Sequence, residues 1–429
     1  MRSWRKTGRI VVPAVVVPLV VAWLAASAYF RLNPLAMNAE LSRVAAAPVL
    51  AWVYQDDMRA ADEIRRTYRI GDPKLLGRDA AESWRQIAAA NPDVHLLDTS
   101  GAAPVAFDVP FVYESPDAPY LREMDRTFGL QAIAGTGNDE YEAMLRLGAW
   151  VGRQFDHGSD QLTGYERQMT PTDVIRAGQN GRKFWCEIAA RLVVQAATAM
   201  GWQARLISAS RTGYRWEHAV AELWSNRYRK WFALDADFNV VYEGRGIPLS
   251  VFELCHRGQV LQQAGALTVR RIAPPKRSLS AVDMIPYYAY VHVDLRNDWN
   301  SRVLRRGSPV SGDRSTWWTA RPSVGPILTA KHRVEDEAVF NWPVNAISLH
   351  AREILRGADG SRQLRVGLTA YSPTFRGFEI SVDGEAWKPA PSADALVPMS
   401  AGAHAIKARV VTPLGYLGPE YEVAFTVTR

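Results

Sequence analysis

The chain has 429 residues, of which 48% are hydrophobic and 22% are charged. This composition is typical of globular domains and excludes a chain that is disordered over most of its length. Glycine and proline occur at ordinary levels, and no motif recurs at the period of a solenoid or a propeller. Collagen-like, low-complexity and repeat architectures are therefore excluded as well.

The formal net charge is +7, from 51 basic and 44 acidic residues. The basic residues are spread along the chain and form no zinc-finger, RNA-recognition or basic-zipper pattern, so we expect no nucleic-acid partner. The two cysteines are too few for a disulfide framework, although one disulfide between them stays open.

An uncharged apolar run, IVVPAVVVPLVVAWLAASAYF, occupies residues 10–30. About 20 such residues suffice for a helix to cross a bilayer. Four basic residues precede the run within the tail 1–9 and only Arg31 follows closely, so the positive-inside rule keeps the tail in the cytoplasm and exports the rest. A cleavable signal peptide is the alternative, because residues 26–28 are small. We therefore expect a single-pass protein of a bacterial inner membrane, with its body in the periplasm.

The next segment, residues 31–108, is predicted to be a helical lead-in. Its runs DDMRAADEIRRTYRI and RDAAESWRQIAAA place apolar residues at helical spacing with charges between them. A packed domain is expected to begin near Val109 and to extend to residue 256. Within it, NDEYEAMLRLGAWVGRQF predicts a helix with Asn138 or Asp139 as its cap.

A second long helix is predicted to begin at Cys186. Apolar residues follow at four-residue steps from Ile188 to Met200, so they lie on one face, and Gly201 suits the end of the helix. Cys186 therefore stands at a helix amino terminus.

Three strand-like runs follow this helix, at 202–209, 218–224 and 230–239. Residues 257–343 contain several prolines and tryptophans and give no firm assignment of structure. Residues 344–429 alternate apolar and polar residues between turn signals, as in NAISLHA and YEVAFTVT. Short, evenly spaced strands predict a small β-sandwich in this last segment.

One cysteine, one histidine and one aspartate follow each other in the predicted core. His218 lies 218 − 186 = 32 residues after Cys186, and Asp235 lies 235 − 218 = 17 residues further on, each on its own predicted strand. A helix amino terminus and a neighbouring imidazolium both favour the thiolate, which is the nucleophilic form of cysteine. A carboxylate on the next strand can hold the imidazole ring in place. The order therefore indicates nucleophilic catalysis.

The spacing of His218 and Asp235 predicts that they face each other across a hairpin. A loop centred between Asn226 and Arg227 pairs residues whose numbers add to 453, and 218 + 235 = 453. Residues directly opposite in an antiparallel pair have Cβ atoms about 4.5–5.5 Å apart. Asp237 then lies one diagonal step from His218 and is the weaker candidate for the carboxylate that holds the imidazole ring. A slip of one residue in the register would send His218 and Asp235 to opposite faces.

These residues resemble the core of the transglutaminase-like superfamily, in which a cysteine at a helix amino terminus precedes a histidine and an aspartate on adjacent antiparallel strands. The resemblance covers about residues 139–248 and is carried by FWCEIAARLVVQAATAMGWQARLIS, EHAVAELW and KWFALDADFN. It implies Cys186 as the nucleophile, His218 as the general base and acid, and Asp235 as the carboxylate that orients the histidine.

Five further positions bear on this resemblance. Trp231 and Glu222 fit the family pattern, whereas Val220 stands where a tryptophan is common. Phe184-Trp185 also replaces the usual glycine or glutamine approach to the cysteine. The oxyanion donors and the substrate therefore stay open; Gln179 and Asn180, which precede the cysteine, are as well explained as loop-capping residues.

Each site residue also has an ordinary structural interpretation. Free cysteines are often buried, and an isolated histidine or aspartate is more often a core or turn residue. A disulfide between Cys186 and Cys255 would make the chain an oxidised scaffold and suppress nucleophilic chemistry.

Five tryptophans could line a groove for an acyl acceptor or a sugar, but core packing is the more common role: Trp185, Trp202, Trp216, Trp224 and Trp231. Asp156, His157 and Asp160 lack a further ligand at suitable spacing, so we expect no metal.

The sequence as a whole predicts an α+β protein with a transglutaminase-like, papain-related core at 109–256. A single N-terminal transmembrane helix and the helical lead-in precede this core, a connecting region at 257–343 follows it, and an immunoglobulin-like β-sandwich occupies 344–429. The expected activity is that of a membrane-tethered cysteine acyltransferase, amidase or peptidase that acts on protein or peptide amides through a thioester, without a cofactor. The alternative is a noncatalytic envelope scaffold that binds protein or polysaccharide.

Overall fold

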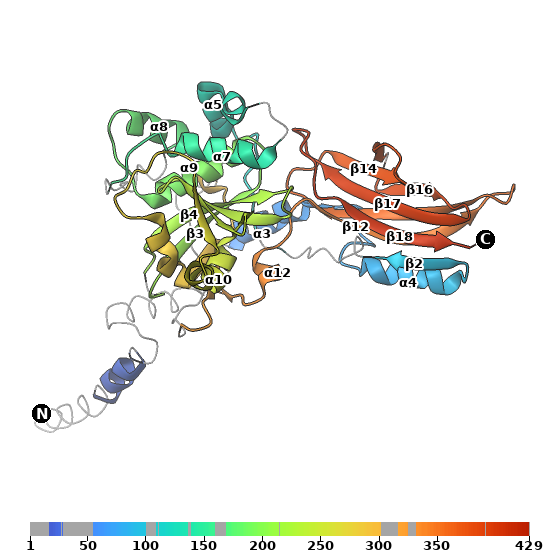
Figure 1. Cartoon of the computed structure of the whole chain (residues 1–429), viewed down its shortest axis with the longest axis horizontal. Coiled ribbons are helices and arrows are strands. Elements are labelled where there is room, and N and C mark those ends of the chain that lie inside the picture. The colour runs from blue at the N-terminus through green and yellow to red at the C-terminus, as the bar shows by residue number, and fades with distance from the viewer. Residues whose placement is uncertain are drawn as a thin grey trace, which may run out of the picture.

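The computed structural model describes residues 17–26, 28, 55–99, 109, 111–135, 139–158, 169–213, 215–301, 316–324, 332–390 and 392–428. Figure 1 shows two bodies side by side, a mixed helix-and-sheet core and an elongated sandwich that ends at the C-terminus. The apolar segment expected to span a membrane, residues 10–30, lies partly outside the described residues, and 17–26 are helical. Within the described ranges, no helix is both long enough and apolar enough to cross a membrane.

The core is built on a nine-stranded sheet with the order β11-β10-β9-β3-β4-β5-β6-β7, in which β8 also pairs with β6. Its strands are β3 (Ala204–Ser210), β4 (His218–Ser225), β5 (Lys230–Asp235), β6 (Val240–Gly244), β7 (Ile247–Pro248), β8 (Leu267–Arg271), β9 (Tyr290–Asp294), β10 (Thr316–Ala320) and β11 (His332–Arg333). All neighbours in the sheet are antiparallel except β10 and β11. The three strands predicted after the cysteine helix therefore form the centre of this sheet.

Two hydrophobic cores cover the two faces of the sheet. The residues of β4 divide between them with period two: Ala219, Ala221 and Leu223 face one core, and Val220 and Trp224 face the other. All of β4 is buried. Burial on both faces explains why apolar residues occupy both alternating sets of positions in this strand, which also contains His218 and Glu222.

Helices pack on both faces of the sheet. They are α5 (Pro119–Phe128), α6 (Leu130–Ala134), α7 (Glu140–Val151), α8 (Pro171–Gln179), α9 (Cys186–Ala199), α10 (Val251–Gln263), the 3₁₀ segment η3 (Ala281–Ala289) and α12 (Glu337–Phe340). Asp139 caps α7 by accepting a hydrogen bond from the Glu142 N–H, as the sequence predicted. Helix α9 begins at Cys186 and ends before Gly201, whose φ is +73°.

The region left unassigned by the sequence, residues 257–343, belongs largely to the core. It supplies β8, β9, β10 and β11 to the central sheet, and η3 packs against α10. The core therefore extends well beyond residue 256, where the sequence had placed its end. These strands have five residues or fewer, too few to show a clear period, so no pattern indicated them in the sequence.

The sandwich consists of two antiparallel sheets that enclose a separate hydrophobic core. Its C-terminal strands are β12 (Ala346–Arg356), β13 (Arg362–Tyr371), β14 (Gly377–Val382), β15 (Lys388–Ala390), β16 (Asp394–Pro398), β17 (Gly402–Val411) and β18 (Tyr421–Val427). The β-sandwich expected in the last segment is thus present. Its assignment to the immunoglobulin-like class stays a prediction.

The lead-in at 31–108 is not a separate helical unit in its described part. After α3 (Gln55–Arg66), β1 (Arg69–Ile70) pairs with β13, and β2 (Val94–Asp98) pairs with β18. Between them lies α4 (Ala80–Ala90), whose Trp84 is fully buried in the sandwich and donates a hydrogen bond to the Leu349 carbonyl at 2.8 Å. Figure 1 shows α4 and β2 beside β18, so residues 69–98 and the C-terminal strands build one domain.

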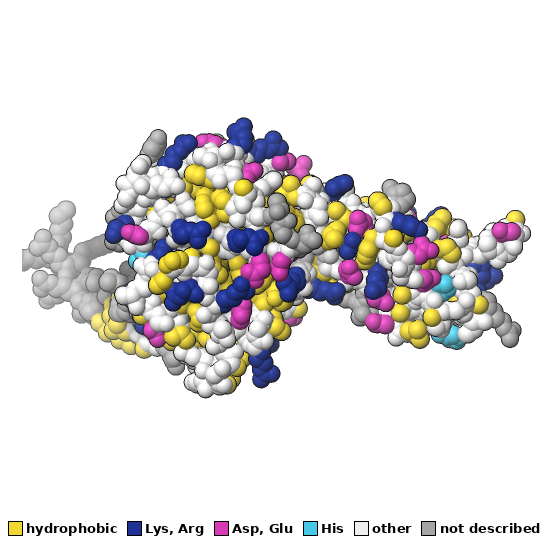
Figure 2. Space-filling model, turned by 45° about the horizontal axis from the view of Figure 1, so that its top comes forward, with side chains coloured by type: hydrophobic (Ala, Val, Ile, Leu, Met, Phe, Trp, Pro, Cys, Tyr) yellow, Lys and Arg dark blue, Asp and Glu magenta, His cyan; other side chains and the backbone are white. Residues whose placement is uncertain are grey.

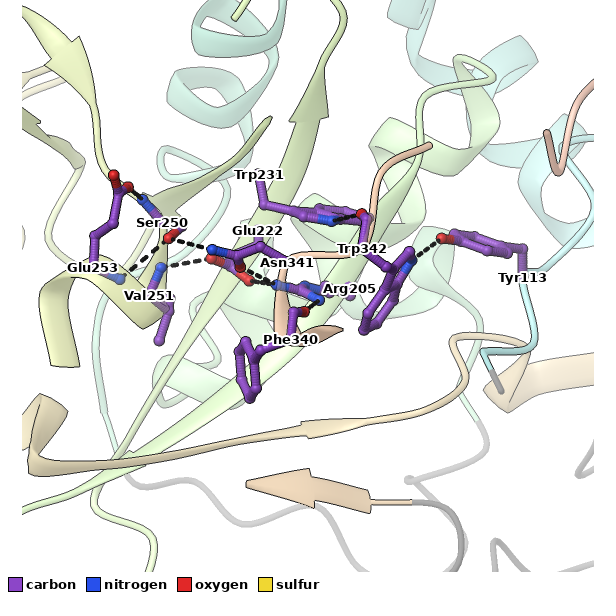
Figure 3. A network of polar contacts seen from close by, with 10 residues as sticks. All are labelled: Tyr113, Arg205, Glu222, Trp231, Ser250, Val251, Glu253, Phe340, Asn341 and Trp342. Carbon is purple, nitrogen blue, oxygen red and sulfur yellow. Dashed lines mark hydrogen bonds and ion pairs between the residues drawn. The ribbon is translucent and has the colours of Figure 1, made fainter. Parts of the chain in front are cut away.

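A buried polar network joins the core to the segment that leads into the sandwich (Figure 3). The Arg205 guanidinium forms an ion pair with Glu222 at 2.6 Å and donates to the Phe340 carbonyl at 2.7 Å; both charged side chains are inaccessible to solvent. The same guanidinium lies 4.4 Å from the ring centroids of Trp231 and of Trp342. A buried charge needs such partners, because desolvation without them is costly.

Candidate active site

Cys186 occupies the first position of α9, at the end of the helix that adjoins the central strands. The residue before it, Trp185, has an extended backbone and makes no side-chain capping bond. The first N–H groups of a helix have no intrahelical partner, and they carry the positive end of the helix dipole. Cys186 is a free thiol of intermediate exposure. The nucleophile candidate therefore lies at a helix amino terminus to which solvent has access.

His218 and Asp235 form a buried pair beside this thiol. His218 Nε2 lies 2.7 Å from Asp235 Oδ2, and both side chains are inaccessible to solvent. The other carboxylate oxygen, Asp235 Oδ1, accepts the backbone N–H groups of Asp237 and Phe238, each at 3.0 Å. The turn that follows β5 thus fixes the carboxylate, and the carboxylate fixes the ring.

The ring nitrogen that does not bind Asp235 is available for the thiol. Within the described part of the chain, His218 Nδ1 has no partner in hydrogen-bond geometry. Burial by itself lowers the pKa of His218, but the charge of Asp235 and its hydrogen bond outweigh burial, and with a smaller contribution from Cys186 they raise the pKa to about 10. His218 is therefore held as an imidazolium through the neutral range, with the Cys186 thiol as a neighbour.

The hairpin register differs from the sequence prediction by two residues. In the structure Trp224 pairs with Trp231 and Ala221 with Leu234, so paired numbers add to 455 and not to 453. The reason is the loop, which consists of residues 226–229 and contains Arg229 with a φ of +53°. Because side chains alternate with period two, a shift of two leaves His218 and Asp235 on the same face, now on a diagonal.

Asp237, the weaker carboxylate candidate, serves a different histidine. Its oxygens bind His157 Nδ1 at 2.8 Å and the Arg277 guanidinium at 2.9 Å, and its side chain is inaccessible to solvent. His157 also forms an isolated bridge with Phe184, two residues before Cys186. This second imidazole–carboxylate pair therefore ties the segment that precedes α9 to the turn that holds Asp235.

The metal alternative at residues 156–160 gains nothing from the structure. Among the described residues, no group of three or more histidine, cysteine or acidic side chains could hold a metal ion. Asp160 lies outside the described residues. His157, the only imidazole of that group, is bound to Asp237.

Two glycines, Gly148 in α7 and Gly152 directly after it, allow the helix to approach the strand that carries Asp235. A Cβ added to Gly148 would lie 2.6 Å from Leu234, and one added to Gly152 would lie 1.8 Å from Asn239 Oδ1. Side chains of ordinary size at either position would push α7 away from β5 and its turn. The two glycines, at i and i+4, were not recognised in the sequence as a contact face.

The second cysteine does not pair with the first. Both are free thiols, and Cys255 is fully buried within α10, where burial raises its pKa to about 12. The disulfide alternative is therefore wrong for this structure. Asn180 is the C-cap of α8, as the sequence favoured, whereas Gln179 is the last residue of that helix and donates its side-chain amide to the Gln154 side chain.

Trp224, Trp231 and Glu222 are structural. Trp224 and Trp231 are buried in the core. Glu222 lies on the same face of β4 as His218 and forms the ion pair with Arg205. Sequence reasoning did not find Tyr288, whose ring lies 6.4 Å from that of His218 in an edge-on contact. Tyr288 lies in η3, within the region where no pattern indicated structure, so no signal in the sequence marked it.

Comparison with known proteins agrees with this geometry. Residues 130–236 match the model of the transglutaminase-like superfamily, and this span includes Cys186, His218 and Asp235. No curated protein shows significant similarity to the chain. The matched residues run from α6 through β5, the elements that position the three side chains. Residues 130–236 are therefore a transglutaminase-like superfamily domain.

Proposed function

We propose that the chain is a cysteine acyltransferase or amide hydrolase that acts on protein or peptide substrates through a thioester. The observation that carries this proposal is the buried His218–Asp235 pair at 2.7 Å, placed beside a cysteine that opens a helix. In this assignment Cys186 is the nucleophile, His218 transfers protons and Asp235 orients the ring.

The first half of the proposed reaction forms the acyl-enzyme. The Cys186 thiolate attacks the amide carbonyl carbon, and the carbonyl oxygen becomes an oxyanion near the free N–H groups of the first turn of α9. His218 then donates its Nδ1 proton to the amide nitrogen. The C–N bond breaks, the amine or ammonia leaves, and a thioester remains on Cys186.

The second half releases the acyl group. Neutral His218 accepts a proton from water or from an amine, and the resulting nucleophile attacks the thioester carbonyl. The C–S bond breaks and the thiolate and imidazolium return. Water gives a carboxylic acid and hence hydrolysis, whereas an amine gives a new amide and hence transamidation.

The site supports this assignment by its charge as well as by its geometry. His218 is held protonated by the charge of Asp235, and an adjacent imidazolium stabilises a thiolate without a separate base. Asp235 is itself fixed by two backbone N–H groups, so it cannot swing away from the ring at low cost. The arrangement is preorganised for proton transfer, as acyl transfer requires.

We also propose that the protein is a single-pass protein of a bacterial inner membrane with the catalytic domain in the periplasm and an immunoglobulin-like sandwich at its C-terminus. This proposal rests on the uncharged residues 10–30 and the four basic residues before them. Alkaline phosphatase fused after residue 40 and after residue 429 would be active at both positions if the body is exported. Inactivity of both fusions would contradict it.

The alkylation rate of Cys186 tests the catalytic assignment. At pH 7 we expect iodoacetamide to modify Cys186 at least about tenfold faster than Cys255, because Cys255 is fully buried and burial raises its pKa to about 12. His218→Ala and Asp235→Asn should each slow the alkylation of Cys186 itself relative to wild type, because each weakens the imidazolium that favours the thiolate. Mass spectrometry of the two cysteine peptides from one sample measures both rates at once.

The matched control is His404→Ala, which removes another buried histidine paired with a carboxylate, Asp383, in the sandwich. It should leave Cys186 alkylation unchanged. Activity is then measured as ammonia released from a glutamine-containing peptide and as fluorescent amine incorporated into it. Equal alkylation of Cys186 in wild type and His218→Ala would refute the dyad and favour the noncatalytic scaffold.

A further inference from the structure

A second group of charged side chains lies beside the catalytic pair. Basic and acidic side chains are interspersed on the face of the molecule that Figure 2 shows, and neither sign forms a continuous patch among the described residues of this face. The more specific arrangement is the contact of His157 and Arg277 with Asp237, which we call the Asp237 cluster. It combines a residue of the turn after β5 with one of the segment that runs beside Phe184.

Asp237 is the centre of this cluster. Its side chain is inaccessible to solvent, and its two oxygens bind His157 Nδ1 at 2.8 Å and the Arg277 guanidinium at 2.9 Å. A carboxylate only accepts hydrogen bonds, so the Nδ1–H of His157 is the donor. A buried carboxylate needs such partners, because its desolvation without them is costly. The charge of Asp237 therefore holds both partners in place.

The Asp237 cluster contacts both members of the catalytic pair on β4 and β5. The backbone N–H of Asp237 donates to Asp235 Oδ1 at 3.0 Å. The Arg277 guanidinium lies 4.8 Å from the ring centroid of Phe238, and that ring meets the His218 imidazole edge-on, with 5.6 Å between the centroids. The turn that carries Asp237 is thus packed against the imidazole and bonded to the carboxylate that orients it.

His157 connects the same cluster to the nucleophile. The Phe184 N–H donates to the Asp156 carbonyl at 3.2 Å, and the Gly158 N–H donates to the Phe184 carbonyl at 3.0 Å. Residues 156–158 therefore form a short parallel bridge with Phe184, whose side chain is fully buried. Cys186 follows two residues later. A displacement of His157 is transmitted to the backbone that leads into the nucleophile.

The start of α9 depends on this bridge because it lacks a side-chain cap. Helices α7, α8 and α10 have Asp139, Thr170 and Ser250 as N-caps, and each of these side chains accepts a backbone N–H of the first turn. The N-cap of α9 is Trp185, which makes no such bond among the described residues. A capping side chain fixes the backbone where a helix begins. At α9 the bridge to residues 156–158 takes that place.

We propose that His157 is a positioning residue of the proposed acyl-transfer reaction, so this role rests on the proposed function. Through the bridge to Phe184, His157 holds the segment that leads into Cys186. Through Asp237, it holds the turn that fixes Asp235 and packs against His218. The hydrogen bond between His157 and Asp237 thereby sets the separation of the thiolate and the imidazolium, which belong to different elements. His157 transfers no proton itself.

The separation of thiolate and imidazolium has a measurable consequence. Their attraction falls as the distance between them grows. A thiol without a neighbouring cation titrates near a pKa of about 8.5, and a close imidazolium lowers that value. The midpoint of the pH profile of Cys186 alkylation therefore reports how well the two groups are aligned.

The test measures this profile from about pH 4 to 10 in the full-length chain, with iodoacetamide and mass spectrometry of the cysteine peptide. His157→Leu removes the donor and keeps most of the volume, and His157→Ala removes both. Each should raise the midpoint by at least about one pH unit. Because 29% of the His157 side chain is exposed, we expect both variants to fold, and urea unfolding checks this.

His157→Asn is the rescue variant. Its amide nitrogen is attached to Cγ, as Nδ1 is in histidine, so it keeps a donor for Asp237. Its midpoint should lie within about 0.3 pH units of wild type. The matched control is His404→Ala in the sandwich, because His404 Nδ1 also lies 2.8 Å from a carboxylate, that of Asp383. This control should keep the midpoint of wild type.

The profile of His218→Ala separates the two proposals. If wild type has the same midpoint as His218→Ala, the catalytic dyad is refuted, and His157 has nothing to position. If these two midpoints differ but His157→Leu and His157→Ala titrate as wild type does, only the positioning role is wrong. That role is also wrong if His157→Asn shifts the midpoint as far as His157→Leu does. Variants that are less stable in urea but keep the midpoint of wild type would show that His157 is purely structural.

Discussion

Arg205 offers a sharp test of how the core is held to the segment that leads into the sandwich. Arg205→Met keeps a chain of similar length between Trp231 and Trp342 but removes the donors. Glu222 Oε2 then stays buried without its cation, and the Phe340 carbonyl loses its bond. Breaking a buried ion pair by removing one partner costs about 3–5 kcal/mol, so we expect a loss of this size in the free energy of unfolding.

A second change distinguishes a lost pair from lost packing. Glu222 also accepts the Val251 N–H at the start of α10, at 2.6 Å, and glutamine at position 222 keeps an oxygen for that bond. Adding Glu222→Gln to Arg205→Met removes the uncompensated charge, so the double variant should regain about 2 kcal/mol relative to the single one. The two changes should therefore not be additive.

Urea unfolding followed by tryptophan emission measures these free energies, because two tryptophans flank the guanidinium. Arg365→Met is the control: its ion pair with Glu353 is largely exposed and should contribute less than about 1 kcal/mol. The reasoning is refuted if Arg205→Met costs no more than this control, or if the double variant is less stable than the single variant.

Three further predictions concern the His218–Asp235 pair, the approach of α7 to the turn after β5, and the packing of α4 on the sandwich. The buried ion pair raises the pKa of His218 to about 10, so the stability that the pair contributes is fully present below pH 6.5 and is lost as pH rises through about 10. Unfolding free energies of wild type and His218→Gln, measured from pH 6 to 11, should therefore converge at the alkaline end. A constant difference between the two would contradict this prediction. Gly152→Ala should cost about 1–3 kcal/mol and slow alkylation of Cys186, since its Cβ would overlap Asn239 Oδ1 at 1.8 Å. An unchanged rate would mean that the turn adapts. Trp84→Ala should lower the free energy of unfolding by about 3–5 kcal/mol and expose backbone amides of β12 and β13 to hydrogen exchange. Faster exchange limited to residues before 100 would show that the sandwich does not need α4.

The sequence by itself determined the parts of the site that depend on local patterns. Four-residue apolar spacing and Gly201 placed Cys186 at the start of α9. Period-two alternation placed His218 and Asp235 on one face, and this conclusion survived a register that differed by two residues, because only an odd shift changes the face. The loop itself was not predictable, since Arg229 adopts a left-handed conformation that its residue type does not signal.

The tertiary structure decided everything that depends on contacts distant in sequence. It assigned Asp237 to His157, 80 residues away, and brought Tyr288 beside His218. It also paired β2 with β18, so that residues near the start of the chain complete a sandwich formed mainly by its end. Short strands such as β1 and β11 have too few residues to show a period, and their pairing is stabilised only by burial against distant segments. The sequence therefore specifies faces and helix ends, whereas partners across the fold are decided by packing.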